Sequence, residues 1–272
     1  QDWLHAASCE GIPSIAVQHG LIYGGHHGYI HAHRPESLRL PDRTYVFGRW
    51  ERDLLIGSSV YRDDEVRVGG SPRLDLVRTD PVDRDAVRAE LGVADGDRLL
   101  VLSATWGTLY RTFYYPVALA SLFDRPLSRV HLVIKLHPSE GDEGPYRAVI
   151  EGIARARGFA PPPMTVVRDI DLYRLLRAAD AHLGIHSTVL TEAVFAGTPN
   201  LLADTFRGND LLGYVEAGVA RPVRTGGDIQ AALDDPPDPA ETEAGRRRFI
   251  EAHFEPGSAT ERIATDVLAW LT

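Results

Sequence analysis

Residues 181–203 constrain the fold more than any other stretch, because two apolar segments flank a polar turn and a helical pattern. The first segment, AHLGI, ends at the polar turn His186-Ser187-Thr188. Apolar residues then recur with a period of about 3.6, and a second apolar segment follows Pro199. This pattern predicts strand, turn, helix and strand, which is the repeating unit of a parallel α/β sheet.

The polar turn before the predicted helix also predicts an anion site. Ser187 or Thr188 can cap the helix, and Glu192 follows one turn later. The N–H groups and the dipole of a helix start favour an anion, and open α/β sheets bind ligands at the carboxyl ends of their strands. We therefore interpret the turn as half of a phosphate or nucleotide site, although an ordinary capped helix fits the same residues.

Composition and charge narrow the class of protein. The 272 residues are 44% hydrophobic and 25% charged, as in ordinary globular domains, and no apolar run is long enough for a membrane span. The net charge of -9 argues against a nucleic-acid partner, which would need a broad basic surface. Cys9 is the only cysteine, which excludes an internal disulfide and a thiolate zinc cluster. We expect a cytoplasmic protein, with peripheral association at the inner face of the membrane left open.

The start of the chain indicates that further structure precedes it. Met164 is the only methionine, and the opening sequence QDWLHAASCEGIPSIAVQHG is typical of the end of a helix that runs into a strand. We therefore expect the N-terminal lobe of this chain to be incomplete.

A buried strand is predicted just before Gln18-His19-Gly20, and a loop rich in glycine and histidine follows it. Four histidines crowd into this loop, namely His26, His27, His31 and His33. No carboxylate or cysteine stands at a recognisable ligand spacing from them, so we predict no metal site. We interpret the loop as the lining of a polar cleft.

Strands alternate with helices along the rest of the chain, and every connection is long enough for a crossover, which predicts parallel sheets. A polar, charged stretch separates two such regions. We predict an α/β protein of two Rossmann-like lobes, divided into a first lobe at 1–80, a linker at 81–97, a second lobe at 98–258 and a final helix at 259–272.

Polar residues follow three predicted strands of the second lobe. Thr105 and Trp106 follow the first, His137 follows the second, and the polar turn described above follows a later one. Because parallel strands end at one edge of a sheet, these side chains can converge on a phosphate. Lys135 either adds positive charge there or points into packing or solvent, and the His-Pro pair that Pro138 completes is also a common end of a strand.

Five motifs resemble, in their order, those of a known family: QHG from Gln18, GSPRLD from Gly70, SATWG from Ser103, KLHP from Lys135 and HSTVLTEA from His186. The series looks like that of GT-B transferases that use cytidine-nucleotide donors. The nearest resemblance is to the CDP-glycerol glycerophosphotransferases, and bacterial sialyl- and Kdo-transferases share the His-Pro pair and the hydroxyl pair.

Two features depart from the glycerophosphotransferase pattern. His186 stands where those enzymes usually have an aspartate, and the sequence Thr191-Glu192-Ala193 is more similar to sugar-nucleotide glycosyltransferases and UDP-GlcNAc 2-epimerases. The resemblance therefore implies the GT-B architecture and leaves cytidine and uridine donors both open.

The resemblance implies roles for residues of the second lobe. His137 would contact the donor phosphate and protonate it as it leaves. Ser187 and Thr188 would bind the same phosphate, and Glu192 would hold the ribose. The implied donor-binding set also includes Thr105, Trp106, Lys135, Pro138 and His186. GT-B enzymes generally act without a bound metal, so the resemblance implies no cofactor besides the nucleotide-activated donor, which is a substrate.

On the acceptor side, the resemblance implies that His19 takes the proton of the acceptor hydroxyl, since an imidazole titrates near neutral pH. Asp75 is the second candidate for this base, and bonding to its own turn explains it equally well. The implied acceptor-side set also includes Gln18, Gly20, His26, His27 and Arg73. The final helix would cross back to the first lobe.

Three hypotheses about function follow. The first is a transferase that moves a sugar or polyol phosphate from a CMP-, CDP- or UDP-linked donor to a hydroxyl of a glycan or small-molecule acceptor, in surface polysaccharide or glycoconjugate synthesis. The second is a UDP-amino-sugar 2-epimerase or hydrolase on the same fold. The third is a non-catalytic GT-B relic that binds a partner protein or a glycan.

Overall fold

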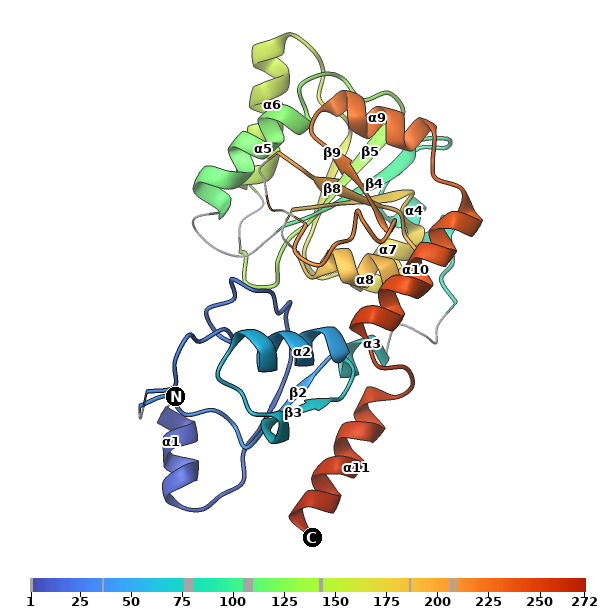
Figure 1. Cartoon of the computed structure of the whole chain (residues 1–272). Helices are drawn as coiled ribbons and strands as arrows, with labels where there is room; N and C mark the ends of the chain where they lie inside the picture. The colour runs from blue at the N-terminus through green and yellow to red at the C-terminus, as the bar shows by residue number, and fades with distance from the viewer. Residues whose placement is uncertain are drawn as a thin grey trace. The chain divides into compact units, whose positions relative to one another are not determined.

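The computed structural model describes residues 2–35, 37–75, 81–104, 110–141, 144–185, 187–205, 208 and 210–272. The chain forms two compact units, one of residues 1–79 with 247–272 and one of residues 80–246. Each unit contains a parallel sheet with flanking helices, so the predicted α/β class is confirmed (Figure 1). None of the described helices combines the length and the apolar character that crossing a membrane requires.

The second unit contains a six-stranded sheet in the order β6-β5-β4-β7-β8-β9, with every neighbouring pair parallel. The chain adds strands on one side of β4 and then returns to add the others on its opposite side. This is the doubly wound order, and its switch point lies between the carboxyl ends of β4 and β7. The strands are β4 (Arg98–Ser103), β5 (Val130–Lys135), β6 (Met164–Val167), β7 (Ala181–Gly184), β8 (Asn200–Ala203) and β9 (Ala220–Val223).

Helices cover both faces of this sheet, which explains the continuous apolar sequence of β4. Leu100 and Leu102 are buried in a cluster with residues of α5, α6 and α9, whereas Leu99 and Val101 are buried in a cluster with residues of α4 and α7. A strand with helices on either side buries both of its faces, so apolar residues follow one another in its middle, here from Leu99 to Leu102. The helices are α4 (Arg84–Glu90), the π-helical turn η3 (Tyr110–Tyr114), α5 (Tyr115–Leu122), α6 (Gly144–Arg157), α7 (Leu172–Ala178), α8 (Val189–Ala196) and α9 (Gly226–Asp234).

Residues 81–97, which the sequence indicates as a linker, belong to the second unit. They contain α4, whose Val87 is fully buried in the core cluster beneath α7. Asp180, just before β7, accepts hydrogen bonds from Arg88 at 3.0 Å and from the backbone N of Leu99 at 2.7 Å. The stretch is polar because α4 presents only one apolar side to the sheet.

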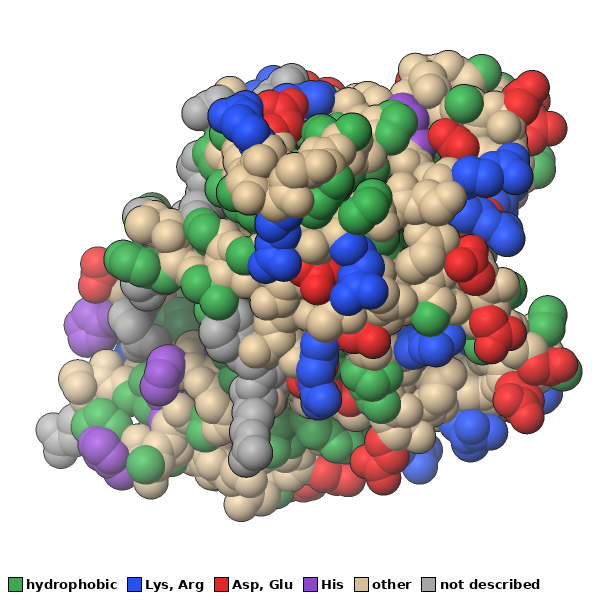
Figure 2. Space-filling model, turned by 90° about the horizontal axis from the view of Figure 1, so that it is seen from above, with side chains coloured by type: hydrophobic (Ala, Val, Ile, Leu, Met, Phe, Trp, Pro, Cys, Tyr) green, Lys and Arg blue, Asp and Glu red, His purple; other side chains and the backbone are tan. Residues whose placement is uncertain are grey.

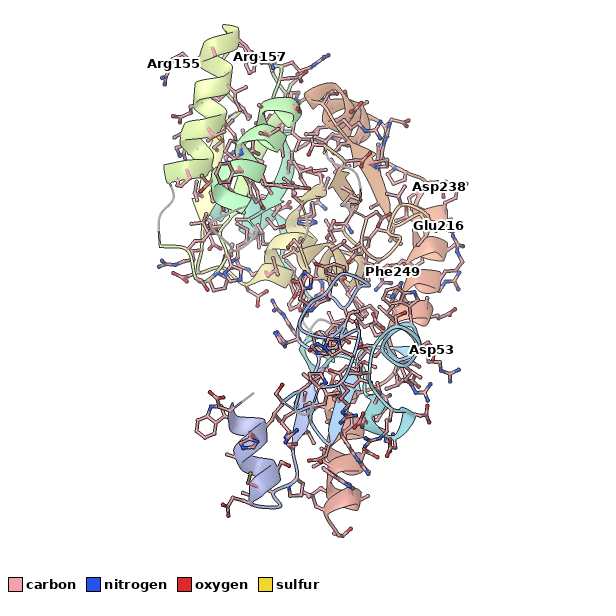
Figure 3. All side chains as sticks on the ribbon, turned by 60° about the vertical axis from the view of Figure 1, so that its left-hand side comes forward. Asp53, Arg155, Arg157, Glu216, Asp238 and Phe249 are labelled. Carbon is pink, nitrogen blue, oxygen red and sulfur yellow. The ribbon has the colours of Figure 1, made fainter. Side chains whose placement is uncertain are left out.

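The first unit contains a three-stranded parallel sheet in the order β1-β2-β3. Val46, Leu55 and Val66 form the centre of its core. The last turns of α10 also belong to this unit, where Phe249, labelled in Figure 3, is buried with its ring centroid 4.7 Å from that of His253. The elements are α1 (Asp2–Cys9), β1 (Ile15–Val17), β2 (Arg43–Val46), α2 (Arg49–Ser58), η1 (Asp63–Glu65), β3 (Val66–Val68), α3 (Pro72–Asp75), α10 (Pro239–His253) and α11 (Ala259–Leu271).

The final helix, α11, packs within the first unit through its first turn. The Asp75 carboxylate accepts hydrogen bonds from the backbone N of Ala259 at 3.1 Å and from the backbone N of Thr260 at 2.9 Å. Gly70, at φ +81°, permits this approach, because a Cβ there would lie 2.9 Å from the Cβ of Ala259. Further along α11, Asp266 accepts a hydrogen bond from the Tyr45 hydroxyl at 2.6 Å.

These contacts give the GSPRLD motif a structural function. Its aspartate, Asp75, satisfies two of the N–H groups that a helix start leaves without a partner inside the helix, and Ser258 accepts from a third, the N–H of Glu261. Asp75 therefore caps the start of α11, and its place as the second candidate for the base stays a prediction.

We predict that Asp75→Ala lowers the free energy of unfolding by about 1–2 kcal/mol, the usual cost of losing a helix cap. Asp75→Asn, which keeps one acceptor oxygen, should lose less. Urea unfolding followed by circular dichroism measures both variants. Unchanged stability in Asp75→Ala would contradict the capping function.

Candidate functional site

The carboxyl ends of β4, β5 and β7 bring the predicted polar turns to one edge of the six-stranded sheet. His137 follows β5, and Ser187 follows β7 on the other side of β4. Ligands of doubly wound sheets bind at this edge, beside the switch point. Thr105, Trp106 and His186 lie outside the described residues.

The turn between β7 and α8 is held close to the sheet. Ser187 is buried, and its Oγ accepts a hydrogen bond from the backbone N of Val189 at 3.2 Å, whereas Thr188 is half-buried. Gly184 lets the helix approach, because a Cβ there would lie 2.7 Å from Cδ2 of Leu190. The first turn of α8 therefore lies directly on β7, and its N-terminal end faces the carboxyl edge of the sheet.

Glu192 lies in the first turns of α8 and is buried. The neighbouring Thr191 hydroxyl lies 2.7 Å from the Tyr214 hydroxyl, and Asp210 accepts from the backbone N of Tyr214 at 2.7 Å. These bonds fix the loop after β8 against α8. The carboxylate of Glu192 is a buried hydrogen-bond acceptor. Helix α8 and the loop after β8 together form its surroundings.

The turn after β5 is fixed by Glu140, which the sequence analysis does not single out. Glu140 is buried, its Oε2 accepts from the backbone N of His137 at 3.0 Å, and its Oε1 accepts from the Tyr146 hydroxyl at 2.6 Å. The signal in the sequence is the spacing of three residues from His137, which is common in polar turns where a side chain bonds back to the backbone. Pro138 is exposed within this turn.

His137 is held in one orientation. Its Nδ1 accepts a hydrogen bond from the backbone N of Ser139 at 3.1 Å, so the neutral imidazole carries its proton on Nε2. Burial lowers the pKa of His137, with Glu140 opposing and Lys135 adding to the shift. The neutral form, a hydrogen-bond donor through Nε2, is therefore favoured at neutral pH.

Lys135, the last residue of β5, is buried, and its Nζ donates to the backbone O of Leu136 at 2.9 Å. Its ammonium is therefore held beside the strand end. Its charge still acts on the site, since it contributes to the lowered pKa of His137.

A buried histidine that the sequence analysis does not single out lies in β7. His182 is fully buried, with Nδ1 2.8 Å from Asn200 Oδ1 and Nε2 2.9 Å from Ser103 Oγ. Burial lowers the pKa of His182 to about 4, and the hydrogen bond to Asn200 opposes this shift. Its only signal in the sequence is one polar residue within an apolar run.

In the first unit, Gln18 is buried and fixes the turn that follows β1. Its Oε1 accepts from the backbone N of Phe47 at 2.8 Å, and its Nε2 donates to the backbone O of Gly20 at 2.8 Å. These two bonds hold the turn at the carboxyl end of the three-stranded sheet. His19, between Gln18 and Gly20, is exposed there.

The other acceptor-side candidates lie in two places. His26 is half-buried between the rings of Tyr23 and Tyr29, at centroid distances of 5.7 and 5.0 Å, and His27 is exposed in the same loop. Arg73 is exposed in α3, in the segment that holds α11. Among the described residues, no group of three or more histidine, cysteine, aspartate or glutamate side chains is placed to hold a metal ion.

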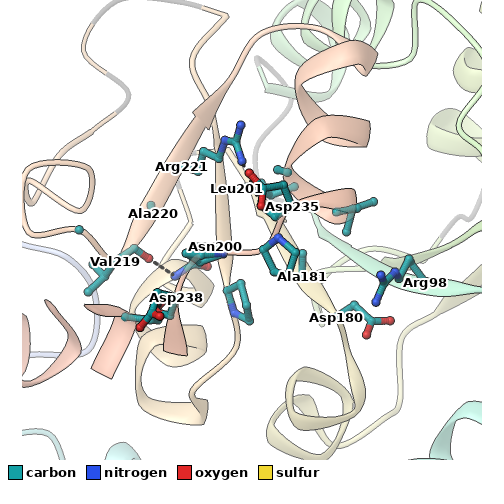
Figure 4. A pocket seen from close by; sticks show the side chains of 17 residues that line it. Arg98, Asp180, Ala181, Asn200, Leu201, Val219, Ala220, Arg221, Asp235 and Asp238 are labelled. Carbon is teal, nitrogen blue, oxygen red and sulfur yellow. Dashed lines mark hydrogen bonds between the residues drawn. The ribbon is translucent and has the colours of Figure 1, made fainter. Parts of the chain in front are cut away.

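A cavity of about 460 Å³ lies at the opposite edge of the six-stranded sheet (Figure 4). The first residues of four strands line it, namely Arg98, Ala181, Asn200 and Ala220. The predicted site residues are not among its lining. It is therefore separate from the polar turns, which follow the carboxyl ends of the strands.

Charged side chains of both signs are interspersed on the face shown in Figure 2. Among the residues coloured there, blue and red side chains alternate over short distances, and no broad basic surface is seen. This distribution agrees with the overall negative charge of the chain.

We predict that His182 makes stability depend on pH. Below its ordinary pKa of 6.5, the unfolded chain binds a proton at His182 that the folded chain binds only near pH 4, so the free energy of unfolding falls as the pH drops through this window. A pKa difference of this size changes the free energy of unfolding by about 3 kcal/mol across the window. His182→Gln, which can replace both hydrogen bonds, should remove this contribution. Urea unfolding at about pH 7 and about pH 4 tests it, and an equal loss in both proteins would contradict the prediction.

Comparison with known proteins rests on structure, since no protein-family model and no curated protein sequence matches the chain. The fold is similar to that of S. aureus MnaA solved with UDP, at 15% identity and a TM-score of 0.64, over 98% of this chain and 70% of MnaA. It is also similar to the UDP-GlcNAc 2-epimerase of Neisseria meningitidis bound to UDP-GlcNAc, at 16% identity and a TM-score of 0.64, over 98% of this chain and 72% of the epimerase.

A third similar structure is the wall teichoic acid polymerase TagF, in its H444N variant. The identity is 12% and the TM-score 0.61, over 96% of this chain and 70% of TagF. Similarity at these identities establishes the fold, and it confirms the resemblance that the order of the five motifs predicts. The chain therefore has the GT-B fold, two Rossmann-like α/β units with parallel sheets, that these nucleotide-sugar enzymes share.

Proposed function

We propose that the chain is a transferase that moves a sugar or a polyol phosphate from a pyrimidine-nucleotide donor to an acceptor hydroxyl. The observation that carries this proposal is the placement of His137 and the start of α8 at the ends of strands on either side of β4. This is the edge at which doubly wound sheets bind nucleotides. The similar structures were solved with UDP or UDP-GlcNAc, which supports the same class of ligand.

The donor phosphate binds at the start of α8. The hydroxyls of Ser187 and Thr188 are hydrogen-bond donors there, and the helix dipole favours negative charge at this end. His137 adds a donor through Nε2, because its Nδ1 is already bonded to the backbone. Its lowered pKa makes it a neutral donor to the bound phosphate, and a phosphate oxygen beside it raises its affinity for a proton as the leaving group departs.

Glu192 holds the ribose of the donor. Its carboxylate is buried on α8, close in sequence to the phosphate-binding turn, and vicinal hydroxyls are the natural donors to a carboxylate. Thr191 and Tyr214 fix the helix and the following loop around it. We propose His19 as the base that takes the proton of the acceptor hydroxyl, with Asp75 as the second candidate.

In the reaction, the oxygen of the acceptor hydroxyl forms a bond to the anomeric carbon or to the phosphorus of the transferred group. The bond from that atom to the nucleotide phosphate oxygen breaks, and the hydroxyl proton passes to His19. Negative charge that develops on the departing nucleotide is stabilised by the start of α8 and by His137. These groups provide the stabilisation that a metal ion provides in other transferases, so we propose a metal-independent reaction in glycan synthesis.

A 2-epimerase or hydrolase of UDP-linked amino sugars is the second candidate. The similarity to the Neisseria meningitidis epimerase and the sequence Thr191-Glu192-Ala193 favour it. The two functions differ in whether an acceptor is required. Incubation of the chain with UDP-GlcNAc alone, followed by NMR of the sugar, separates them, because only the second candidate consumes or epimerises the donor without an acceptor.

We predict that one pyrimidine nucleotide among CMP, CDP, UMP and UDP raises the melting temperature in the presence of EDTA. A ligand at one hundred times its dissociation constant stabilises the folded state by about 2.7 kcal/mol, which a thermal-shift assay detects readily. His137→Ala should weaken the effect because a donor to the phosphate is lost. His5→Ala, which removes an exposed histidine of α1 in the first unit, is the control and should respond like the unmodified chain.

If none of the four nucleotides raises the melting temperature, the result contradicts the proposed function. A shift that requires a divalent metal would overturn its metal-independent part only.

A further inference from the structure

The hydrogen bonds around His182 have one defined direction. The side-chain N of Asn200 donates to the backbone O of Leu190 at 3.0 Å and to the backbone O of Val219 at 3.4 Å. Because only the amide nitrogen can donate to two carbonyls, the amide oxygen of Asn200 must face His182. The proton of the imidazole is therefore on Nδ1, and Nε2 accepts from the Ser103 hydroxyl.

The result is a chain of donors that crosses three neighbouring strands. Ser103 of β4 donates to His182 of β7, His182 donates to Asn200 of β8, and Asn200 donates to Leu190 of α8. All three side chains are at most 3% exposed, namely Ser103, His182 and Asn200. The loss of a partner would therefore leave a buried polar group without its hydrogen bond and lower the stability of the fold. We call these three residues the relay.

Both ends of the relay reach the candidate site. Ser103 is the last residue of β4, directly before the segment that leads to Thr105 and Trp106. At the other end, Leu190 lies in the first turn of α8 and packs over Gly184, whose missing Cβ would also lie 2.9 Å from the His182 ring. The relay thus links the end of β4 to the start of α8.

We infer that Ser103, His182 and Asn200 position the donor site by fixing the start of α8 relative to the end of β4. The inference rests on the proposed function for its ligand and deepens it, because it names residues that touch no substrate and yet set how well the nucleotide phosphate fits. Backbone ladders join the strands to one another. The bond from Asn200 to Leu190 extends this connection to the helix that would bind the phosphate.

The test compares Ser103→Ala with Thr198→Ala in the full chain. Both variants remove a buried hydroxyl that donates one hydrogen bond, but Thr198 donates to the backbone O of Leu176 at 2.7 Å and lies outside the relay. Hydrogen exchange of residues 187–192 and the dissociation constant for the best of the four nucleotides are measured in each. Ser103→Thr, which keeps the hydroxyl, tests for rescue.

We expect Ser103→Ala to speed exchange in residues 187–192 and to weaken nucleotide binding, each by about tenfold, the effect of one lost buried hydrogen bond. Ser103→Thr should restore both quantities, and Thr198→Ala should change neither, although it also lowers stability. Equal effects of Ser103→Ala and Thr198→Ala on exchange would overturn the inference.

Hydrogen exchange without nucleotide and nitrogen NMR of His182 test the inference in two further cases. If the unmodified chain binds no nucleotide, the proposed function fails, and the exchange data alone still decide whether the relay fixes α8. If Ser103→Ala does not fold, nitrogen NMR of the unmodified chain identifies the His182 tautomer. A proton on Nδ1 supports the relay, and a proton on Nε2 overturns it.

Discussion

The reversal of strand order between β4 and β7 is the constraint on which the second unit depends. Parallel strands need crossovers, and crossovers that run in opposite directions from β4 put helices on both faces of the sheet. In sheets of this order, the connections on either side of the switch point leave in opposite directions and make room for a ligand between them. His137 and Ser187 can bind one phosphate only because this topology brings the ends of β5 and β7 to the same edge of the sheet.

Burial explains how this edge is kept rigid. Glu140 holds the turn of His137, and the relay of Ser103, His182 and Asn200 joins the strands beneath the start of α8. Each of these four buried side chains makes hydrogen bonds to its neighbours, which makes one arrangement of the turns far more stable than its alternatives. A phosphate site at a helix start needs such rigidity, because its donors stabilise the bound charge only when they are already aligned.

The sequence is informative about local structure and much less so about partners. The alternation of apolar runs and helical patterns predicts the α/β class and the strand ends correctly, because both signals lie within a few residues. The capping function of Asp75 could not be predicted in the same way, since its partner Ala259 lies 184 positions further along the chain. The hydrogen bonds of His182 could not be predicted either, because its partners Ser103 and Asn200 lie on the two neighbouring strands and the sequence does not give the strand order. The stretch 81–97 is polar and charged, which predicts a linker, whereas the burial of Val87 depends on its contact with α7, far away in the sequence.

The most direct test of this account is a hydrogen-exchange footprint of the bound nucleotide on the unmodified chain. We predict slower exchange at residues 136–141 and 187–192, which follow the carboxyl ends of β5 and β7, and no change at the amino-edge cavity lined by Asn200 and Ala220. Protection at that cavity, with the two polar turns unaffected, would contradict the claim that the switch point is the nucleotide site.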